Sequence, residues 1–118
     1  MAEFSELLGK TLEKAENQSN ERIIFTTNTG EEYTLYHKED CCETVRVEDV
    51  IGDLSDLVGA PILMAEEVGS DDPPLRESDE SYTWTFYKLA TIKGYVTIRW
   101  YGESNGQYSE SVSFEKSN

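Results

Sequence analysis

Alternating apolar and polar positions mark most of this chain as β-strand. Residues 22–27 and 32–37 are rich in β-branched and aromatic side chains, and Asn28, Thr29 and Gly30 lie between them. Gly30 can supply the positive φ that such a tight reversal requires. The pattern therefore predicts a β-hairpin over these residues.

The same alternation predicts strands along the rest of the chain. They are expected at residues 11–16, 44–50, 62–68, 82–91, 95–101 and 107–114. The last three are joined by turns at Lys93-Gly94 and at residues 103–106, whose Asn105-Gly106 pair is typical of hairpins. Short helical turns are expected at residues 2–8 and 53–58. We predict a mainly β fold, with α+β as the alternative: a single-domain antiparallel meander of about eight strands with one or two short helices.

Residues 69–81 differ in composition from the predicted strands. They contain two prolines, five acids and several small polar residues. Such a composition cannot bury apolar surface. We expect a mobile acidic loop here, within one domain that spans residues 1–118.

The chain is strongly acidic. Its 118 residues include 24 Asp and Glu but 10 Lys and Arg, which gives a formal net charge of -14. The acids concentrate between residues 39 and 80, whereas residues 81–102 contain none. Phosphate recognition needs a basic surface, so direct nucleic-acid binding is not expected. The surplus charge suits a basic partner, or serves only solubility.

A row of carboxylates on a β-protein can imitate a nucleic-acid backbone. Strand residues two positions apart are separated by about 6.6 Å, a spacing comparable to that of neighbouring phosphates. The alternative is a solvated surface without a partner. The candidate partner-binding acids are Glu48, Asp49, Asp53, Asp56, Asp71, Asp72, Glu77, Asp79 and Glu80.

Aromatic and basic side chains are interleaved in residues 81–102. Strand parity assigns them to two faces of a sheet. The face expected to be buried consists of Trp84, Phe86, Val96, Ile98 and Trp100. The other face, exposed unless a helix or loop covers it, consists of Thr83, Thr85, Tyr87, Tyr95, Thr97, Arg99 and Tyr101.

An exposed face of this kind suits a small ligand. Tyrosines can stack on a base, and a cation can pair with a phosphate or carboxylate. The candidate ligand-binding residues are Tyr87, Lys88, Arg99, Tyr101 and, near the rim, His37.

The neighbouring cysteines allow several interpretations. His37, Cys41 and Cys42 are weak metal-ligand candidates, because paired zinc ligands are normally two to four residues apart and adjacent residues of an extended chain face opposite ways. A thiol nucleophile beside His37 and a vicinal disulfide switch are further alternatives. The simplest interpretation is two reduced thiols, one packed in the core and the other in a turn.

Other chemical signatures are absent from the sequence. It has no glycine-rich phosphate loop, no nucleophile elbow and no metalloprotease motif, and a single histidine restricts acid-base schemes. We expect binding rather than catalysis, and no cofactor. No apolar run approaches a membrane span and no secretory signal is present, so we expect a cytoplasmic monomer or homodimer.

Several segments are distinctive together, above all DCCE at residues 40–43 and WTFYKLATIKG at residues 84–94. The chain resembles a family of small uncharacterised bacteriophage and bacterial proteins, classified as a domain of unknown function. The resemblance covers nearly the whole chain outside the acidic loop. It brings no established activity and so assigns no functional residues. It implies a phage or prophage protein in the cytosol of a bacterial host, a context in which small acidic proteins often bind and disable a host factor.

Three functional hypotheses follow. The first is a non-enzymatic accessory protein that binds a basic host protein, such as a nucleic-acid-acting defence enzyme. The second is a module that sequesters a small nucleotide-like or anionic ligand on the aromatic sheet face. The third is a thiol- or metal-dependent enzyme that uses Cys41 or Cys42 with His37.

Overall fold

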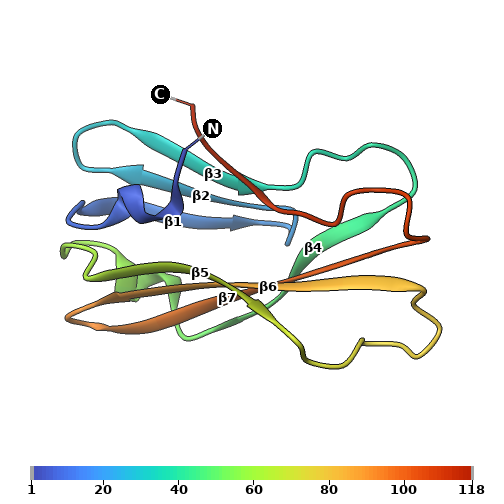
Figure 1. Ribbon diagram of the computed structural model, residues 1–118. Helices are drawn as coiled ribbons and strands as arrows, with labels where there is room; N and C mark the ends of the chain where they lie inside the picture. Colours follow the sequence, from blue (N-terminus) through green and yellow to red (C-terminus); the bar gives the residue numbers. More distant parts are fainter. Residues whose placement is uncertain (1, 118) are drawn as a thin grey trace.

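The computed structural model describes residues 2–117, which form a sandwich of two four-stranded antiparallel sheets (Figure 1). The strands are β1 (Leu12–Gln18), β2 (Arg22–Thr27), β3 (Glu32–Tyr36), β4 (Thr44–Ile51), β5 (Met64–Ser70), β6 (Ser81–Thr91), β7 (Gly94–Ser104) and β8 (Ser113–Lys116). The helical elements are two short 3-10 turns, η1 (Phe4–Leu7) and η2 (Leu54–Leu57). The prediction of a mainly β single domain with about eight strands and one or two short helices is confirmed.

The first sheet has the order β1-β2-β3-β8. The predicted hairpin between β2 and β3 is confirmed, with Phe25 opposite Tyr33 and with Gly30 at a φ of 89°. The sheet is completed by β8, which pairs with the other edge of β3 and places Phe114 opposite Leu35. This sheet therefore joins the two ends of the sequence.

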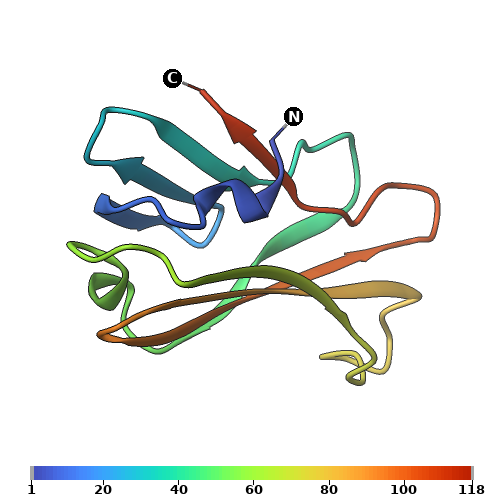
Figure 2. The same ribbon diagram turned by 60° about the vertical axis from the view of Figure 1, so that its left-hand side comes forward.

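The second sheet has the order β4-β7-β6-β5. Its strands β5, β6 and β7 form a meander, and β4 pairs with the far edge of β7. The chain crosses from the first sheet to the second between β3 and β4, and it crosses back between β7 and β8 (Figure 2). Both crossings connect the layers at the same end of the sandwich.

The predicted hairpin between β7 and a strand at residues 107–114 is wrong. A turn does form, because Gly106 adopts a φ of 93° and the Asn105 side chain accepts a hydrogen bond from the Gln107 backbone. Residues 107–112 are mostly polar and none of them is buried, so they gain nothing by extending the second sheet. Phe114 instead stacks on Tyr33, with ring centroids 5.3 Å apart, and anchors β8 in the first sheet.

The hydrophobic core lies between the inner faces of the two sheets. Phe25 and Leu35 come from the first sheet, and Ile98 and Trp100 come from the second. Phe4 of η1 links the layers, because its ring contacts Phe25, Phe114 and Tyr87 in edge-to-face geometry. Within residues 2–117 no helix has the length and apolar character that a membrane span requires.

Gly52 supports the connection from β4 to η2 and yields a stability prediction. It has a φ of 100°, and a Cβ at this position would lie 2.5 Å from the backbone oxygen of Tyr95. Gly52→Ala should therefore lower the free energy of unfolding by about 2 kcal/mol, because left-handed backbone and steric overlap both oppose a side chain. Urea denaturation measures the effect. Gly69→Ala is the matched control, since nothing lies within 4 Å of its Cβ position; equal stability of the two variants would contradict the prediction.

Candidate functional site

The β6–β7 turn decides which aromatic residues face the core. Only Ile92 and Lys93 lie between the paired residues Thr91 and Gly94, so even-numbered residues of β6 face odd-numbered residues of β7. Trp84 consequently lies opposite Tyr101. The prediction that the same parity faces the core on both strands is right for β7, where Val96, Ile98 and Trp100 are buried, and wrong for β6.

The corrected register moves several predicted residues to the other face. Tyr87 lies opposite Ile98 in the core and is 1% exposed, so its predicted exposed position is wrong. Burial raises the pKa of Tyr87, and the neighbouring Glu67 carboxylate adds to the shift. Trp84 and Phe86, expected in the core, share the outer face with Arg99 and Tyr101 instead.

Arg99 is held at the centre of this outer face. Its guanidinium carbon lies 4.8 Å from the Trp84 ring centroid and 5.2 Å from that of Phe86. Its Nη1 donates a hydrogen bond to Asp49 Oδ2 at 2.8 Å. Lys88 lies further along β6, half-buried between its register partners Glu66 and Thr97. The guanidinium of Arg99 is thus already paired within the protein.

Residues 71–80 cover the aromatic side chains at the other end of this face. Trp84 Nε1 donates to the Pro73 carbonyl oxygen at 3.0 Å. The Tyr101 hydroxyl accepts from the Leu75 backbone at 3.2 Å and donates to the Asp79 carboxylate. Trp84 and Tyr101 are consequently only 3% and 4% exposed. Burial and the bond to Asp79 raise the pKa of Tyr101 to about 12.

The candidate acids divide into structural and unpaired groups. Asp49 pairs with Arg99, and Asp79 binds Tyr101. Asp53 caps η2 by accepting from the Ser55 backbone at 2.9 Å, which lowers its pKa. Within residues 2–117 the remaining candidates take part in no ion pair: Glu48, Asp56, Asp71, Asp72, Glu77 and Glu80.

These acids do not form one row along a strand. Asp53 and Asp56 lie at η2, which contacts the β6–β7 turn through a hydrogen bond from Thr91 Oγ1 to the Asp56 carbonyl. Asp71, Asp72, Glu77 and Glu80 lie in the connection between β5 and the start of β6. Glu48 and Asp49 lie within β4, whereas the other candidate acids lie at the two ends of the second sheet.

A buried carboxylate organises the connection from β3 to β4. Glu43 Oε2 accepts from His37 Nε2 at 2.6 Å and from the Asp40 backbone at 2.8 Å, and Glu43 Oε1 accepts from the Cys41 backbone at 3.0 Å. These donors, Cys41 N–H first and His37 second, lower the pKa of Glu43 to about 2. His37 Nδ1 lies 2.7 Å from the Ser111 carbonyl oxygen. Both ring nitrogens thus lie within hydrogen-bond distance of an oxygen atom.

The two cysteines lie outside the core, on the outside of this connection. Cys41 and Cys42 are joined to each other by a disulfide and both are exposed. The expectations of reduced thiols and of one cysteine in the core are therefore wrong. The chain bends here instead of running extended, so both sulfur atoms lie on the same side, and Glu43 takes the buried position.

His37 is not free to serve the cysteines, because both of its ring nitrogens are engaged elsewhere. Nor do His37, Cys41 and Cys42 meet with other donors: in the described part of the chain, no group of three or more His, Cys, Asp and Glu side chains is placed to hold a metal ion.

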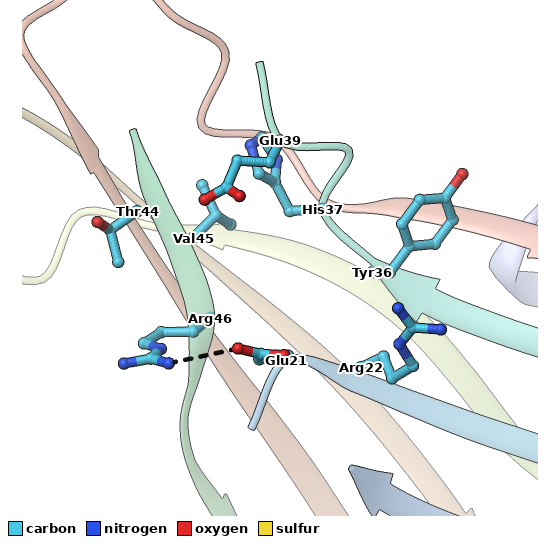
Figure 3. A pocket seen from close by; sticks show the side chains of 8 residues that line it. All are labelled: Glu21, Arg22, Tyr36, His37, Glu39, Thr44, Val45 and Arg46. Carbon is cyan, nitrogen blue, oxygen red and sulfur yellow. Dashed lines mark ion pairs between the residues drawn. The ribbon is translucent and has the colours of Figure 1, made fainter. Parts of the chain in front are cut away.

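An open cleft of about 530 Å³ lies beside this connection, where the two sheets diverge (Figure 3). Arg22, Tyr36 and His37 line one side, and Arg46 of β4 lines the other. Arg46 Nη2 lies 3.9 Å from Glu21 Oε1, so its charge is partly compensated. The cleft mixes both signs of charge and is open to solvent.

The structure does not unite the five predicted ligand-binding residues. His37 lies at the cleft, Tyr87 lies in the core, and the other three lie on the outer face of the second sheet. Exposed apolar residues at the β6–β7 turn were not among the predicted site residues. An isoleucine in a two-residue turn, where Asn, Asp and Gly are usual, is the signal that could have found them.

These features define a small acidic β-sandwich domain with a covered aromatic face. Residues 5–114 match the family described as a domain of unknown function (DUF7448), and the chain belongs to this family. Comparison with curated proteins and with solved structures finds no match.

The lowered pKa of Glu43 predicts a pH-dependent stability. A carboxyl whose pKa falls from 4.5 to about 2 on folding stabilises the native state fully above pH 4.5, and the contribution is lost as the pH falls towards 2. Glu43→Gln should be less stable than the native chain at pH 7 and should lose less stability on acidification. Urea denaturation between pH 7 and pH 3 tests this. Exposed Glu13→Gln is the control; identical pH profiles for all three proteins would refute the role of Glu43.

The Tyr101 hydroxyl predicts how residues 71–80 are held. Tyr101→Phe removes two hydrogen bonds and should destabilise this segment by about 1 kcal/mol while the fold persists. Hydrogen exchange at residues 71–80 should accelerate by about fivefold. Tyr82→Phe is the matched control, because Tyr82 stacks on Tyr101 at 6.2 Å but is 39% exposed. Unchanged exchange in Tyr101→Phe would show that other contacts hold the segment.

Proposed function

We propose that this protein acts by binding a basic protein partner through the acidic surface formed by residues 71–80. One observation carries the proposal. Trp84 and Tyr101 of the second sheet bind this segment through Pro73, Leu75 and Asp79. Its other four acids, Asp71, Asp72, Glu77 and Glu80, are exposed.

Because the segment is held against the sheet, its carboxylates contribute more to the binding free energy than those of a mobile loop would. An acidic segment without contacts must lose conformational entropy when a partner binds, whereas a segment already bonded to a sheet loses less. The net charge of -14 attracts a basic protein over a long range and repels nucleic acid. Affinity therefore comes from charge complementarity at residues 71–80. The net charge of the whole molecule raises the rate of association with the partner.

The proposed partner is a host protein with a basic nucleic-acid-binding groove. Such a groove is built to contact phosphates, and closely spaced carboxylates can occupy the same cationic side chains. The resemblance to bacteriophage proteins supports a phage or prophage accessory protein that antagonises a host defence enzyme without catalysis of its own.

The alternative, a nucleotide-like or anionic ligand on the aromatic face, has less support. Tyr87 faces the core, Arg99 is paired with Asp49, and the segment around Leu75 covers Tyr101. Such a ligand would have to displace residues 71–80 before it could reach the rings.

Two charge-matched variants test the proposed function. The first neutralises the exposed acids of the segment by the changes Asp71→Asn, Asp72→Asn, Glu77→Gln and Glu80→Gln. The control neutralises the same number of acids outside the second sheet by the changes Glu13→Gln, Glu16→Gln, Glu39→Gln and Asp40→Asn. Each tagged protein is used to capture partners from a bacterial lysate, with low-salt and then high-salt washes and identification by mass spectrometry.

We expect the native protein and the control to retain the same basic nucleic-acid-acting protein and to release it in high salt. The first variant should retain about tenfold less, the equivalent of about 1.4 kcal/mol. Equal retention by both variants would contradict the assignment to residues 71–80. A captured nucleotide in place of a protein would favour the alternative ligand.

A further inference from the structure

The outer face of the second sheet ends in a cluster of exposed apolar side chains at the β6–β7 turn, which we call the hairpin patch. Its members are Ile51, Ile92 and Tyr95, which are 57%, 81% and 76% exposed. Ile51 lies opposite Thr97 and Tyr95 lies opposite Ala90, so both point to the same side as Arg99. The patch therefore lies on the same face as residues 71–80, at the opposite end of β6 (Figure 1).

Folding gives no reason for these side chains to be apolar. The core lies on the other side of the sheet, where Val96 and Ile98 are buried. Ile92 occupies a two-residue turn, a position where Asn, Asp and Gly are favoured. Single exposed apolar residues are ordinary, but a cluster at one end of a sheet face is typical of a contact surface.

The patch has a fixed backbone. Gly52 approaches so closely that a Cβ there would lie 3.3 Å from Val96 Cα. Thr91 Oγ1 donates to the Asp56 carbonyl oxygen, and Lys93 Nζ donates to the Val58 carbonyl oxygen at 2.6 Å. These contacts join the turn to η2 in one unit, as both views of the fold show (Figures 1 and 2).

Acids surround the patch on the η2 side. Asp53 is exposed, and Asp56 Oδ2 lies 3.1 Å from the Cβ position of Gly94. Asp49 lies two residues before Ile51 and pairs with Arg99. Of the nearby cations, Lys93 is bound to a backbone oxygen, Arg99 is paired with Asp49, and Lys88 lies beside its register partner Glu66. An apolar centre with an acidic rim complements a basic surface that carries an apolar side chain.

We infer that the hairpin patch is a docking site for a basic protein segment. An aliphatic or aromatic side chain of the partner packs among Ile51, Ile92 and Tyr95, while flanking Lys or Arg side chains pair with Asp53 and Asp56. A second copy of this chain fits less well, because it would bring the same acidic rim and a net charge of -14.

The inference rests on the proposed function and extends it. Trp84, which bonds to residues 71–80, and Thr91, which begins the β6–β7 turn, are seven residues apart along β6, about 23 Å. A protein interface of ordinary size, about 800 Å² on each partner, is of comparable extent. The same basic partner can therefore contact both regions. Its charges pair with the acids of residues 71–80, and its apolar side chain is buried at the hairpin patch.

Two synthetic peptides of equal charge test the docking site by NMR. One alternates Lys with Leu and the other alternates Lys with Ser, and each is titrated into the ¹⁵N-labelled protein. We expect the Lys-Leu peptide to shift the amides of Ile51, Ile92 and Tyr95 and to bind there about tenfold more tightly than the Lys-Ser peptide. The variants Ile92→Ser and Tyr95→Ser should abolish this preference. Leu8→Ser, which removes an apolar residue that is 48% exposed elsewhere, should preserve it.

The outcomes separate the docking site from the proposed function. If both peptides bind equally and shift only residues 71–80, the docking site is refuted and the acidic surface stands. Should neither peptide bind at low salt, the acidic surface fails as well. Shifts of the patch amides that grow with protein concentration before peptide is added would identify a second copy as the occupant and overturn the inference.

Discussion

The length of the β6–β7 turn is the constraint on which the second sheet depends. Two residues separate the paired positions Thr91 and Gly94, and this spacing directs Tyr87, Leu89, Ile98 and Trp100 to the core. The same spacing directs Trp84, Arg99 and Tyr101 outward. A turn one residue longer would reverse the faces of one strand relative to the other, because side-chain direction alternates along a strand. The core, the covered aromatic face and the hairpin patch all follow from this register.

The outward-facing aromatic residues act as an anchor for an acidic segment. A tyrosine or tryptophan whose polar atom bonds to a loop fixes that loop at little entropic cost to its own ring. Tyr101 and Trp84 do so for residues 71–80, which leaves the sheet face closed and the acids outward. The aromatic and acidic blocks of the sequence are therefore parts of one surface. This arrangement connects a feature of composition to the binding role that we propose.

Local signals predicted much of the fold, and long-range ones did not. The hairpin of β2 and β3, the short helical turn η2 and the strand content follow from turn residues and from the alternation of apolar and polar positions. To know which residues of β6 and β7 share a face, the exact number of residues in the turn must be known. The ends of predicted strands are uncertain by one or two residues, which is enough to reverse the faces. β8 pairs with β3 because Phe114 packs against Tyr33, a contact between residues far apart in the sequence. Cys41 and Cys42 are exposed because Glu43 occupies the buried position in this connection. The acidic candidate residues could be identified from composition alone. The residues of the hairpin patch could be grouped only once the strand register was known.

The position of β8 also determines when the domain can close during synthesis. β3 can pair with β2 once both strands have been synthesised, but its other edge stays unpaired until β8 is made, since Tyr33 and Lys116 are register partners. Until then the nascent chain has an open strand edge and lacks the Phe114 ring that contacts Phe4 and Phe25. Open edges of this kind pair readily with other chains. The high net negative charge of the chain opposes such encounters by repulsion between copies, so the acidity to which we assign partner binding also keeps unfinished chains apart.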